Sequence, residues 1–205
     1  MSMGRDDAFE AALGVLRTRL RDGHLPPGSR IAASRLAASL HLSATPVREA
    51  LSRLAGEGLV EERRRQGFFV RTLSGVDVAD LYRMALAQLL ILSGRDRGRR
   101  LPAPEALARP TDPVQATEAF FLAWVAAAGS RALVETYRTT VAQLGPVRRV
   151  EPLVFDDLAA ESAELMSQAG AVEMPDLLQA LRKFHGRRIQ AADRLSAALN
   201  AGRKI

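Results

Sequence analysis

The sequence predicts a mainly α-helical protein that carries a small β-hairpin in its amino-terminal third. Apolar residues recur at helical spacing along most of the 205 residues, as at Phe9, Leu13, Leu16 and Leu20. Two short apolar runs with a basic turn between them lie at residues 59–71, which favours a hairpin there. Glycine and proline separate the periodic segments and set the expected element boundaries.

The amino-terminal elements are expected in the order helix, helix, helix, hairpin. The helices are predicted at residues 6–22, 33–40 and 44–55, and the third has Ser43 or Thr45 as a possible cap. The strands are predicted at Leu59–Glu62 and Phe68–Arg71, joined by a tip at residues 63–67. This order is typical of a winged helix-turn-helix, so we expect such a domain over residues 1–73.

The rest of the chain is expected to be an all-helical bundle over residues 77–205, after a linker at 74–76. Its predicted helices have broad apolar stripes and span residues 77–93, 114–128, 130–144, 152–169 and 176–201. Gly145-Pro146 is expected to end the third of them, because proline removes a helical hydrogen bond. Residues 94–113, rich in arginine, glycine and proline, are expected to form a long loop.

The composition is that of a folded protein, with 47% hydrophobic and 25% charged residues. It contains no apolar run of the roughly 20 residues that a membrane helix needs, and no export signal is visible in MSMGRDDAFE. Cysteine is absent, which excludes thiolate catalysis and Cys-ligated zinc. We therefore expect a cytoplasmic protein without membrane partners.

The charge balance favours a polyanionic partner. The net charge is +6, and residues 1–75 carry 12 basic and 8 acidic side chains, against 17 and 15 in the remainder. The excess of positive charge is therefore densest where the winged helix is predicted, which points to double-stranded DNA.

The candidate DNA-binding residues lie around the third predicted helix and the hairpin: Arg35, Ser43, Thr45, Arg48, Arg65 and Gly67. The start of that helix favours phosphate through its free N–H groups, and an arginine projecting from it can bind guanine O6 and N7. A glycine at the wing lets backbone approach DNA. The alternatives are that Ser43 and Thr45 act only as caps and that the arginines are solvated surface charges.

This region resembles the DNA-binding domain of the GntR family of bacterial transcription regulators over roughly residues 8–72. The resemblance rests on Leu25-x-Pro27-Gly28-Ser29-Arg30-Ile31, Leu36-Ala37, Leu42-Ser43-x-Thr45-Pro46-Val47-Arg48-Glu49-Ala50-Leu51, Leu54, Glu57-Gly58-Leu59-Val60 and Gly67-x-x-Val70. It implies a dimer in which Arg48 reads a base and the wing tip around Gly67 contacts the minor groove or backbone. Ala44 stands where members usually have arginine, so the family's common operator is not expected.

The second region resembles the helical effector domain of the FadR subfamily, through Asp80-Leu81-Tyr82, Phe120 to Leu133 and Asp176 to His185. Many members hold a divalent metal there with one aspartate and three histidines. In this sequence the aspartate position falls on Thr117 and the first histidine position on Phe121, and of the ligands only the last histidine has a counterpart, His185. Metal sites of this kind need three or four ligands, so we expect no cofactor and no bound metal.

A small-molecule effector site is predicted at Phe121, Trp124 and His185, whose surroundings are expected to be apolar. The alternative is that the aromatic residues only fill a core and that His185 is hydrogen-bonded within it.

An enzyme is not expected, because no nucleophile elbow, P-loop, dinucleotide fingerprint or HExxH is present. The acidic pairs Asp156-Asp157 and Glu161/Glu164 are expected to be solvated. The predicted function is that of a homodimeric transcription regulator, most simply a repressor, that binds an inverted-repeat operator and responds to a small molecule. The alternative is a ligand-independent or non-specific DNA-binding protein whose second domain serves only for dimerisation.

Overall fold

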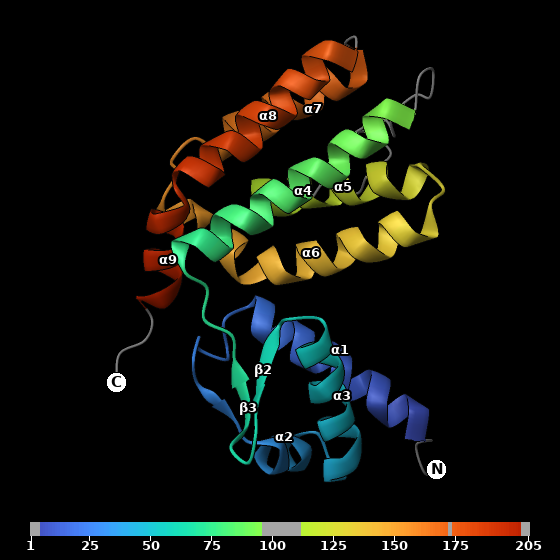
Figure 1. Cartoon of the computed structure of the whole chain (residues 1–205), viewed down its shortest axis with the longest axis vertical. Helices are drawn as coiled ribbons and strands as arrows, with labels where there is room; N and C mark the ends of the chain where they lie inside the picture. The colour runs from blue at the N-terminus through green and yellow to red at the C-terminus, as the bar shows by residue number, and fades with distance from the viewer. Residues whose placement is uncertain (1–4, 96–111, 172–173, 202–205) are drawn as a thin grey trace. The chain divides into compact units, whose positions relative to one another are not determined.

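The computed structural model describes residues 5–95, 112–171 and 174–201, which fall into two units (Figure 1). The first comprises Met1–Leu73 together with Leu199–Ile205, and the second comprises Ser74–Ala198. Each unit has its own buried apolar core. The fold is mainly helical with one small sheet, which confirms the predicted class.

Three helices form the body of the first unit: α1 (Arg5–Arg21), α2 (Ala33–Ser39) and α3 (Ala44–Gly56). Each follows a predicted helix to within a residue or two, because each has a continuous apolar stripe. The stripe of α1 packs against α3, and their buried side chains make up much of the core: Leu13, Leu16, Leu20, Val47, Ala50, Leu51 and Leu54.

The turn between α2 and α3 is a tight Schellman turn. The N–H of Leu42 donates to the carbonyl of Ala37 (3.0 Å), and the N–H of His41 donates to that of Ala38 (3.2 Å). His41 occupies the left-handed region with φ of 54°, where glycine is more usual. Residues 40–43 thereby join the two helices within four residues.

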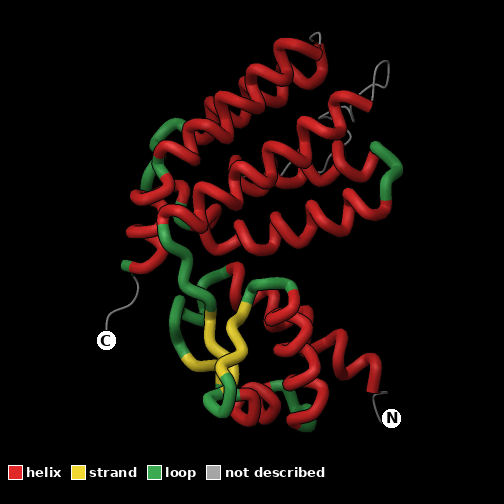
Figure 2. The backbone as a smooth tube through the Cα atoms, in the orientation of Figure 1, coloured by secondary structure: helices red, strands yellow, loops and turns green. Residues whose placement is uncertain are grey.

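A three-stranded antiparallel sheet completes the unit, in the order β1-β3-β2 (Figure 2). It comprises β1 (Arg30–Ile31), β2 (Val60–Arg63) and β3 (Gly67–Val70). Arg63 pairs with Gly67 at the tip, and Ile31 of β1 pairs with Phe68. The hairpin was predicted, whereas β1 was not, because two residues are too short to show an alternating pattern.

The second unit is helical. Its elements are α4 (Gly75–Arg95), α5 (Pro113–Ala127), α6 (Arg131–Arg149), the 3-10 turn η2 (Glu151–Leu153), α7 (Leu158–Ala171), α8 (Met174–Gln190) and α9 (Ala192–Asn200). The last two residues of α9 are counted with the first unit. Figure 1 shows α4 between α8 on one side and α6 on the other, and both pairs are in contact. No helix among the described residues is long and apolar enough to cross a membrane.

Two boundaries differ from the sequence prediction. The linker expected at residues 74–76 is shorter, because α4 begins at Gly75; the N–H of Asp77 donates to the Ser74 hydroxyl (3.2 Å), and the N–H of Ser74 donates to the Asp77 carboxylate (2.9 Å). The single helix expected over 176–201 is broken at Ala191 into α8 and α9. Its apolar stripe continues across the break, so the pattern carried no sign of it. Most of the loop expected at 94–113 lies outside the described residues.

The helix expected to end at Gly145-Pro146 instead continues to Arg149. Pro146 lies inside α6 and removes one backbone hydrogen bond, which costs about 3 kcal/mol in an unsupported helix. Burial of residues on both sides of the proline offsets this loss, since Tyr137, Leu144 and Val147 are fully buried. The last turn of α6 therefore projects Arg148 into the bundle.

Candidate nucleic-acid interface and candidate effector site

The recognition face of α3 is the exposed stripe formed by Thr45, Arg48 and Ser52. These residues are spaced three and four apart and therefore lie on one side of the helix. Among the described residues Arg48 has no ion-pair partner, whereas Arg53 of the same helix pairs with Glu57, which also pairs with Arg17 of α1 (both 2.8 Å). The guanidinium of Arg48 is thus available to an external acceptor.

The start of α3 has backbone donors directed outward, as expected for a phosphate-binding helix end. Ser43 is the N-cap residue and is exposed, but its side chain makes no capping hydrogen bond. The expectation that Ser43 acts as a side-chain cap is therefore wrong. Its hydroxyl is thus not used as a cap and can serve an external phosphate instead.

The turn of the wing holds Arg65 in a conformation that arginine rarely adopts. The N–H of Gln66 donates to the carbonyl of Arg63 (2.9 Å), and Arg65 has φ of 61° within this turn. Arg63 is engaged inside the wing, with Glu61 at 2.9 Å and its guanidinium 4.1 Å from the centre of the Phe69 ring. Arg65 is exposed and has no such partner among the described residues.

Gly67 follows at the tip of the wing with φ of 91°, in the region that favours glycine. Its nearest side-chain neighbour is Arg30 of β1, whose guanidinium nitrogens lie 3.9 Å from the position of a Cβ on Gly67. Sequence reasoning did not select Arg30, because β1 was not predicted and nothing else placed residue 30 beside the wing. Arg30 is exposed and adds a positive charge there.

The candidate residues converge at one end of this unit. Figure 1 shows the start of α3, helix α2 and the turn between β2 and β3 together at that end. Arg35 is exposed on α2, so its charge joins those of Arg48 and Arg65 there. An exposed recognition helix beside a basic hairpin defines a winged helix-turn-helix, a class of DNA-binding domain.

The comparisons with known proteins identify the family of this domain. Residues 10–70 match the family model for "Bacterial regulatory proteins, gntR family". The Nta operon transcriptional regulator of Aminobacter aminovorans is 46% identical over 61 residues, which are 30% of this chain and 29% of that protein. An uncharacterized HTH-type transcriptional regulator of Agrobacterium vitis is 35% identical over 77 residues, 38% of this chain and 45% of that protein. The family model thus matches the winged helix-turn-helix domain, which is less than half of the chain.

Solved structures share the fold over nearly the whole chain. McbR/YncC of E. coli superposes with a TM-score of 0.72 and 20% identity, covering 95% of this chain and 99% of that one. A putative transcriptional regulator GntR from Rhodococcus sp. RHA1 gives a TM-score of 0.73 and 22% identity, covering 90% and 96%. By sequence, the chain spans less than half the length of the two curated relatives above. Both relatives are described as transcriptional regulators.

The predicted effector residues lie inside the second unit. Phe121, Trp124 and His185 are all 0% exposed. The Phe121 ring lies 5.5 Å from that of His185 and 5.4 Å from that of Phe184, while Trp124 lies 6.4 Å from Phe120. In this arrangement the aromatic rings pack against one another.

His185 is a neutral hydrogen-bond donor in this core. Its Nδ1–H donates to the carbonyl of Leu181 (2.9 Å), which leaves Nε2 unprotonated. The pKa of His185 is lowered to about 3, chiefly by burial; the hydrogen bond to Leu181 opposes this shift, and the charges of Arg148 and Arg188 add to it.

The residues at the metal positions of the FadR subfamily do not fit a metal. Thr117 donates its hydroxyl to the carbonyl of Pro113 (2.8 Å) and lies 3.1 Å from the Ser162 hydroxyl, and Phe121 offers only its ring. Across the described part of the chain, no three His, Asp or Glu side chains are grouped so that they could hold a metal ion.

A buried ionic network lies beside the aromatic core, where sequence reasoning expected solvated carboxylates. Arg188 donates Nε and Nη2 to the two oxygens of Glu151 (3.1 and 2.8 Å) and also pairs with Glu161 (2.9 Å). Tyr82 of α4 donates to Glu151 at 2.5 Å, and burial followed by the charge of Glu151 raises its pKa, so it remains a donor. The network ties α4 to η2, α7 and α8. The expectation that Glu161 is solvated is wrong, and Asp157 is engaged by Arg187.

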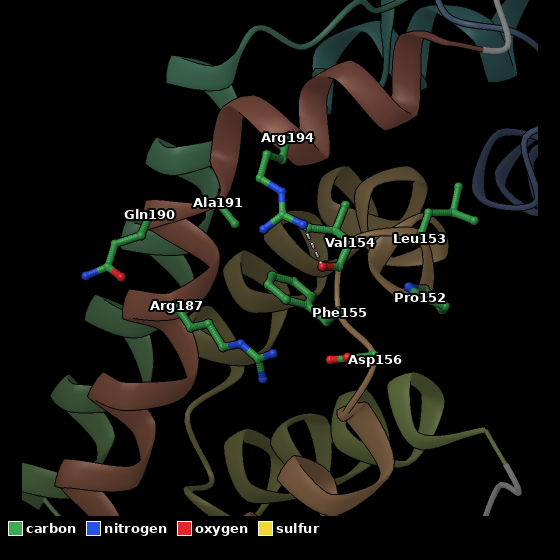
Figure 3. Close-up of a pocket in the computed structure, with 9 residues that line it drawn as sticks. All are labelled: Pro152, Leu153, Val154, Phe155, Asp156, Arg187, Gln190, Ala191 and Arg194. Atoms are coloured by element: carbon green, nitrogen blue, oxygen red, sulfur yellow. Dashed lines mark hydrogen bonds between the residues drawn. The ribbon is translucent and has the colours of Figure 1, made fainter.

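A surface groove of about 570 Å³ lies between α8, α9 and the segment after η2 (Figure 3). Arg194 donates to the carbonyl of Val154 (3.0 Å), and Arg187 lies over the Phe155 ring at 4.4 Å while pairing with Asp157. Both arginines are thus engaged by the protein itself. The groove is therefore a weaker candidate for a ligand site than the interior of the bundle, where buried polar atoms have no partner among the described residues.

Proposed function

We propose that the protein is a DNA-binding transcription regulator, acting as a repressor in the cytoplasm, that reads an inverted-repeat operator as a homodimer. The observation that carries this proposal is the exposed Arg48 on the start of α3, at the same end of the domain as the basic wing. Arg48 reads a base in the major groove, and Thr45 and Ser43 hold the flanking phosphates. Arg35 and Arg65 add phosphate contacts on either side.

A second copy of the chain is proposed to pack on the outer face of α4. Val76, Met84 and Ile91 are 70%, 54% and 54% exposed, and their spacing places them on one stripe of this helix. Pairing of two such stripes buries them and gives the dimer a two-fold axis. A two-fold protein then favours two half-sites in inverted orientation.

A small molecule bound in the second unit is proposed to change operator affinity. Helix α4 begins two residues after Leu73, where the DNA-binding unit ends, and Tyr82 ties it to Glu151. A ligand that shifts this network also shifts the helix that bears the proposed dimer contact. Differential binding to two arrangements of the dimer supplies the coupling.

Selection of bound duplexes from a random double-stranded pool tests the proposal. We expect an enriched inverted repeat that the full chain binds at least a thousandfold more tightly than unrelated DNA. A pool that shows no enriched motif, with binding that depends only on salt, would favour the alternative of a non-specific DNA-binding protein.

A further inference from the structure

Arg148 of α6 is a buried cation whose strongest hydrogen-bonding edge has no acceptor. The residue is 2% exposed, and among the described residues neither Nε nor Nη2 has a hydrogen-bond partner. These two nitrogens form the side edge of the guanidinium, which binds a carboxylate through two parallel hydrogen bonds. Arg188 of the same bundle uses the same two nitrogens on Glu151. The same edge of Arg148 is therefore suited to bind a carboxylate, but no carboxylate of the described residues occupies it.

The counter-charge of Arg148 does not fill this edge. Glu118 of α5 approaches the other terminal nitrogen, Nη1, and the distance of 3.8 Å is an ion pair but not a hydrogen bond. Buried donors without acceptors are rare in folded proteins, because desolvating them is unfavourable. A molecule that supplies acceptors to Arg148 would relieve this penalty.

The same bundle buries a second donor and an acceptor without partners among the described residues. Glu118, the counter-charge of Arg148, lies one turn before Phe121 on α5, and the Phe121 ring is 5.5 Å from that of His185. The Tyr137 hydroxyl is buried without a hydrogen-bond partner; burial raises its pKa, Arg148 opposes this and Glu118 adds to it, so both charges act on the phenol. The Nε2 of His185 is unprotonated and likewise has no partner, and the charge of Arg148 reaches it. The interior of the bundle thus holds the donors of Arg148 and Tyr137 together with two acceptors, Nε2 of His185 and the Glu118 carboxylate.

The charge balance narrows the class of ligand. Glu118 already compensates Arg148, while Arg188 is compensated by Glu151 and Glu161. A simple carboxylate would bring an excess negative charge into this buried region, which is strongly unfavourable. A zwitterion adds no net charge, and it can both accept hydrogen bonds from the donors and donate hydrogen bonds to the acceptors.

We propose that Arg148, Tyr137, Glu118 and His185 form the site of a zwitterionic ligand of the α-amino acid class. The ligand carboxylate binds Nε and Nη2 of Arg148 and accepts from Tyr137, and its ammonium group donates to Glu118 and to Nε2 of His185. The regulatory meaning of this site rests on the proposed function. A zwitterionic site differs from the apolar surroundings that the sequence predicted for Phe121, Trp124 and His185.

The first test measures the melting temperature of the full chain with each of the twenty proteinogenic L-amino acids at millimolar concentration. We expect at least one to raise it. The matched acid without the amino group and the matched amine without the carboxylate, such as propionate and ethylamine for alanine, should leave it unchanged. The proposal is overturned if no amino acid stabilises the chain, or if the acid alone stabilises it equally.

Variants then locate the site by calorimetric titration with the stabilising amino acid. Tyr137→Phe removes one buried hydroxyl and should weaken binding about tenfold or more, and Arg148→Gln should weaken it further. Arg149→Gln, at the exposed neighbouring position, is the matched control and should change the Kd less than twofold. Equal affinity in Tyr137→Phe and Arg149→Gln overturns the assignment, even if Arg148→Gln fails to fold.

DNA binding is measured separately on the same protein. An enriched operator without amino-acid binding would leave the proposed function standing and remove this inference. Amino-acid binding without an operator would do the reverse.

Discussion

Replacing Arg65 by glycine should separate the stability of the wing from its affinity for DNA. Arg65 has φ of 61° and is exposed, without a partner among the described residues. The left-handed conformation costs a residue with a Cβ about 1–2 kcal/mol, and glycine loses about 0.5–1 kcal/mol more backbone entropy on folding. The free energy of unfolding should therefore rise by about 0–1.5 kcal/mol in Arg65→Gly.

The matched variant is Arg64→Gly, in the same turn. Residue 64 does not have a positive φ, so the substitution brings only the entropic loss and should lower the free energy of unfolding by about 0.5–1 kcal/mol. Urea denaturation compares the free energies of unfolding of the two variants. Equal destabilisation by both variants would refute the conformational argument.

The same variant should weaken DNA binding. One phosphate contact near 0.15 M salt contributes about 1 kcal/mol through counterion release, so loss of two per dimer corresponds to about thirtyfold in Kd. The slope of log K against log salt should become shallower by about 2. Fluorescence anisotropy with the selected operator measures both quantities. An unchanged slope would show that Arg65 does not contact phosphate.

Three further predictions concern the second unit. Met84→Arg should give a monomer in sedimentation of the full chain, and a dimer of unchanged mass would exclude the outer face of α4 as the interface. The pKa of His185 is about 3 in the folded state and about 6.5 in the unfolded state. As the pH falls below 6.5, the unfolded state binds a proton that the folded state does not, so the free energy of unfolding decreases. Between pH 7 and 5 the wild type should lose about 2 kcal/mol more than His185→Asn, and equal losses would contradict a buried neutral imidazole. Elemental analysis should find no stoichiometric metal, since Thr117 and Phe121 offer no ligand set; one metal per chain would contradict this.

The DNA-binding domain was predictable because its signals are local. The apolar stripes of α1 and α3 and the Gly67 turn each lie within a few residues of sequence and specify an element by themselves. The two-residue strand β1 forms only because β3 is beside it, so Arg30 was not placed at the wing. No local sequence pattern predicts the pairing of so short a strand.

The interior of the bundle was less predictable, for two physical reasons. Pro146 indicated the end of a helix, yet tertiary packing carries α6 past it and turns Arg148 inward. Glu161 was expected to be solvated, and the approach of Arg188 from α8 makes it an ion-pair partner together with Glu151, which the sequence did not single out. Phe121, Trp124 and His185 were correctly expected to share an interior, but the polar atoms around them come from helices distant in sequence.

The central claim, that the start of α3 reads DNA bases, is tested most directly by comparing Arg48→Ala with Arg53→Ala on the selected operator. Both arginines are exposed on the same helix, but Arg53 is engaged by Glu57. Arg48→Ala should lower the binding free energy by about 1–3 kcal/mol and relax base preference at one position in each half-site. Arg53→Ala should leave both unchanged within about 0.5 kcal/mol. Equal effects of the two variants, or an Arg48→Ala protein with full affinity and specificity, would contradict the assignment.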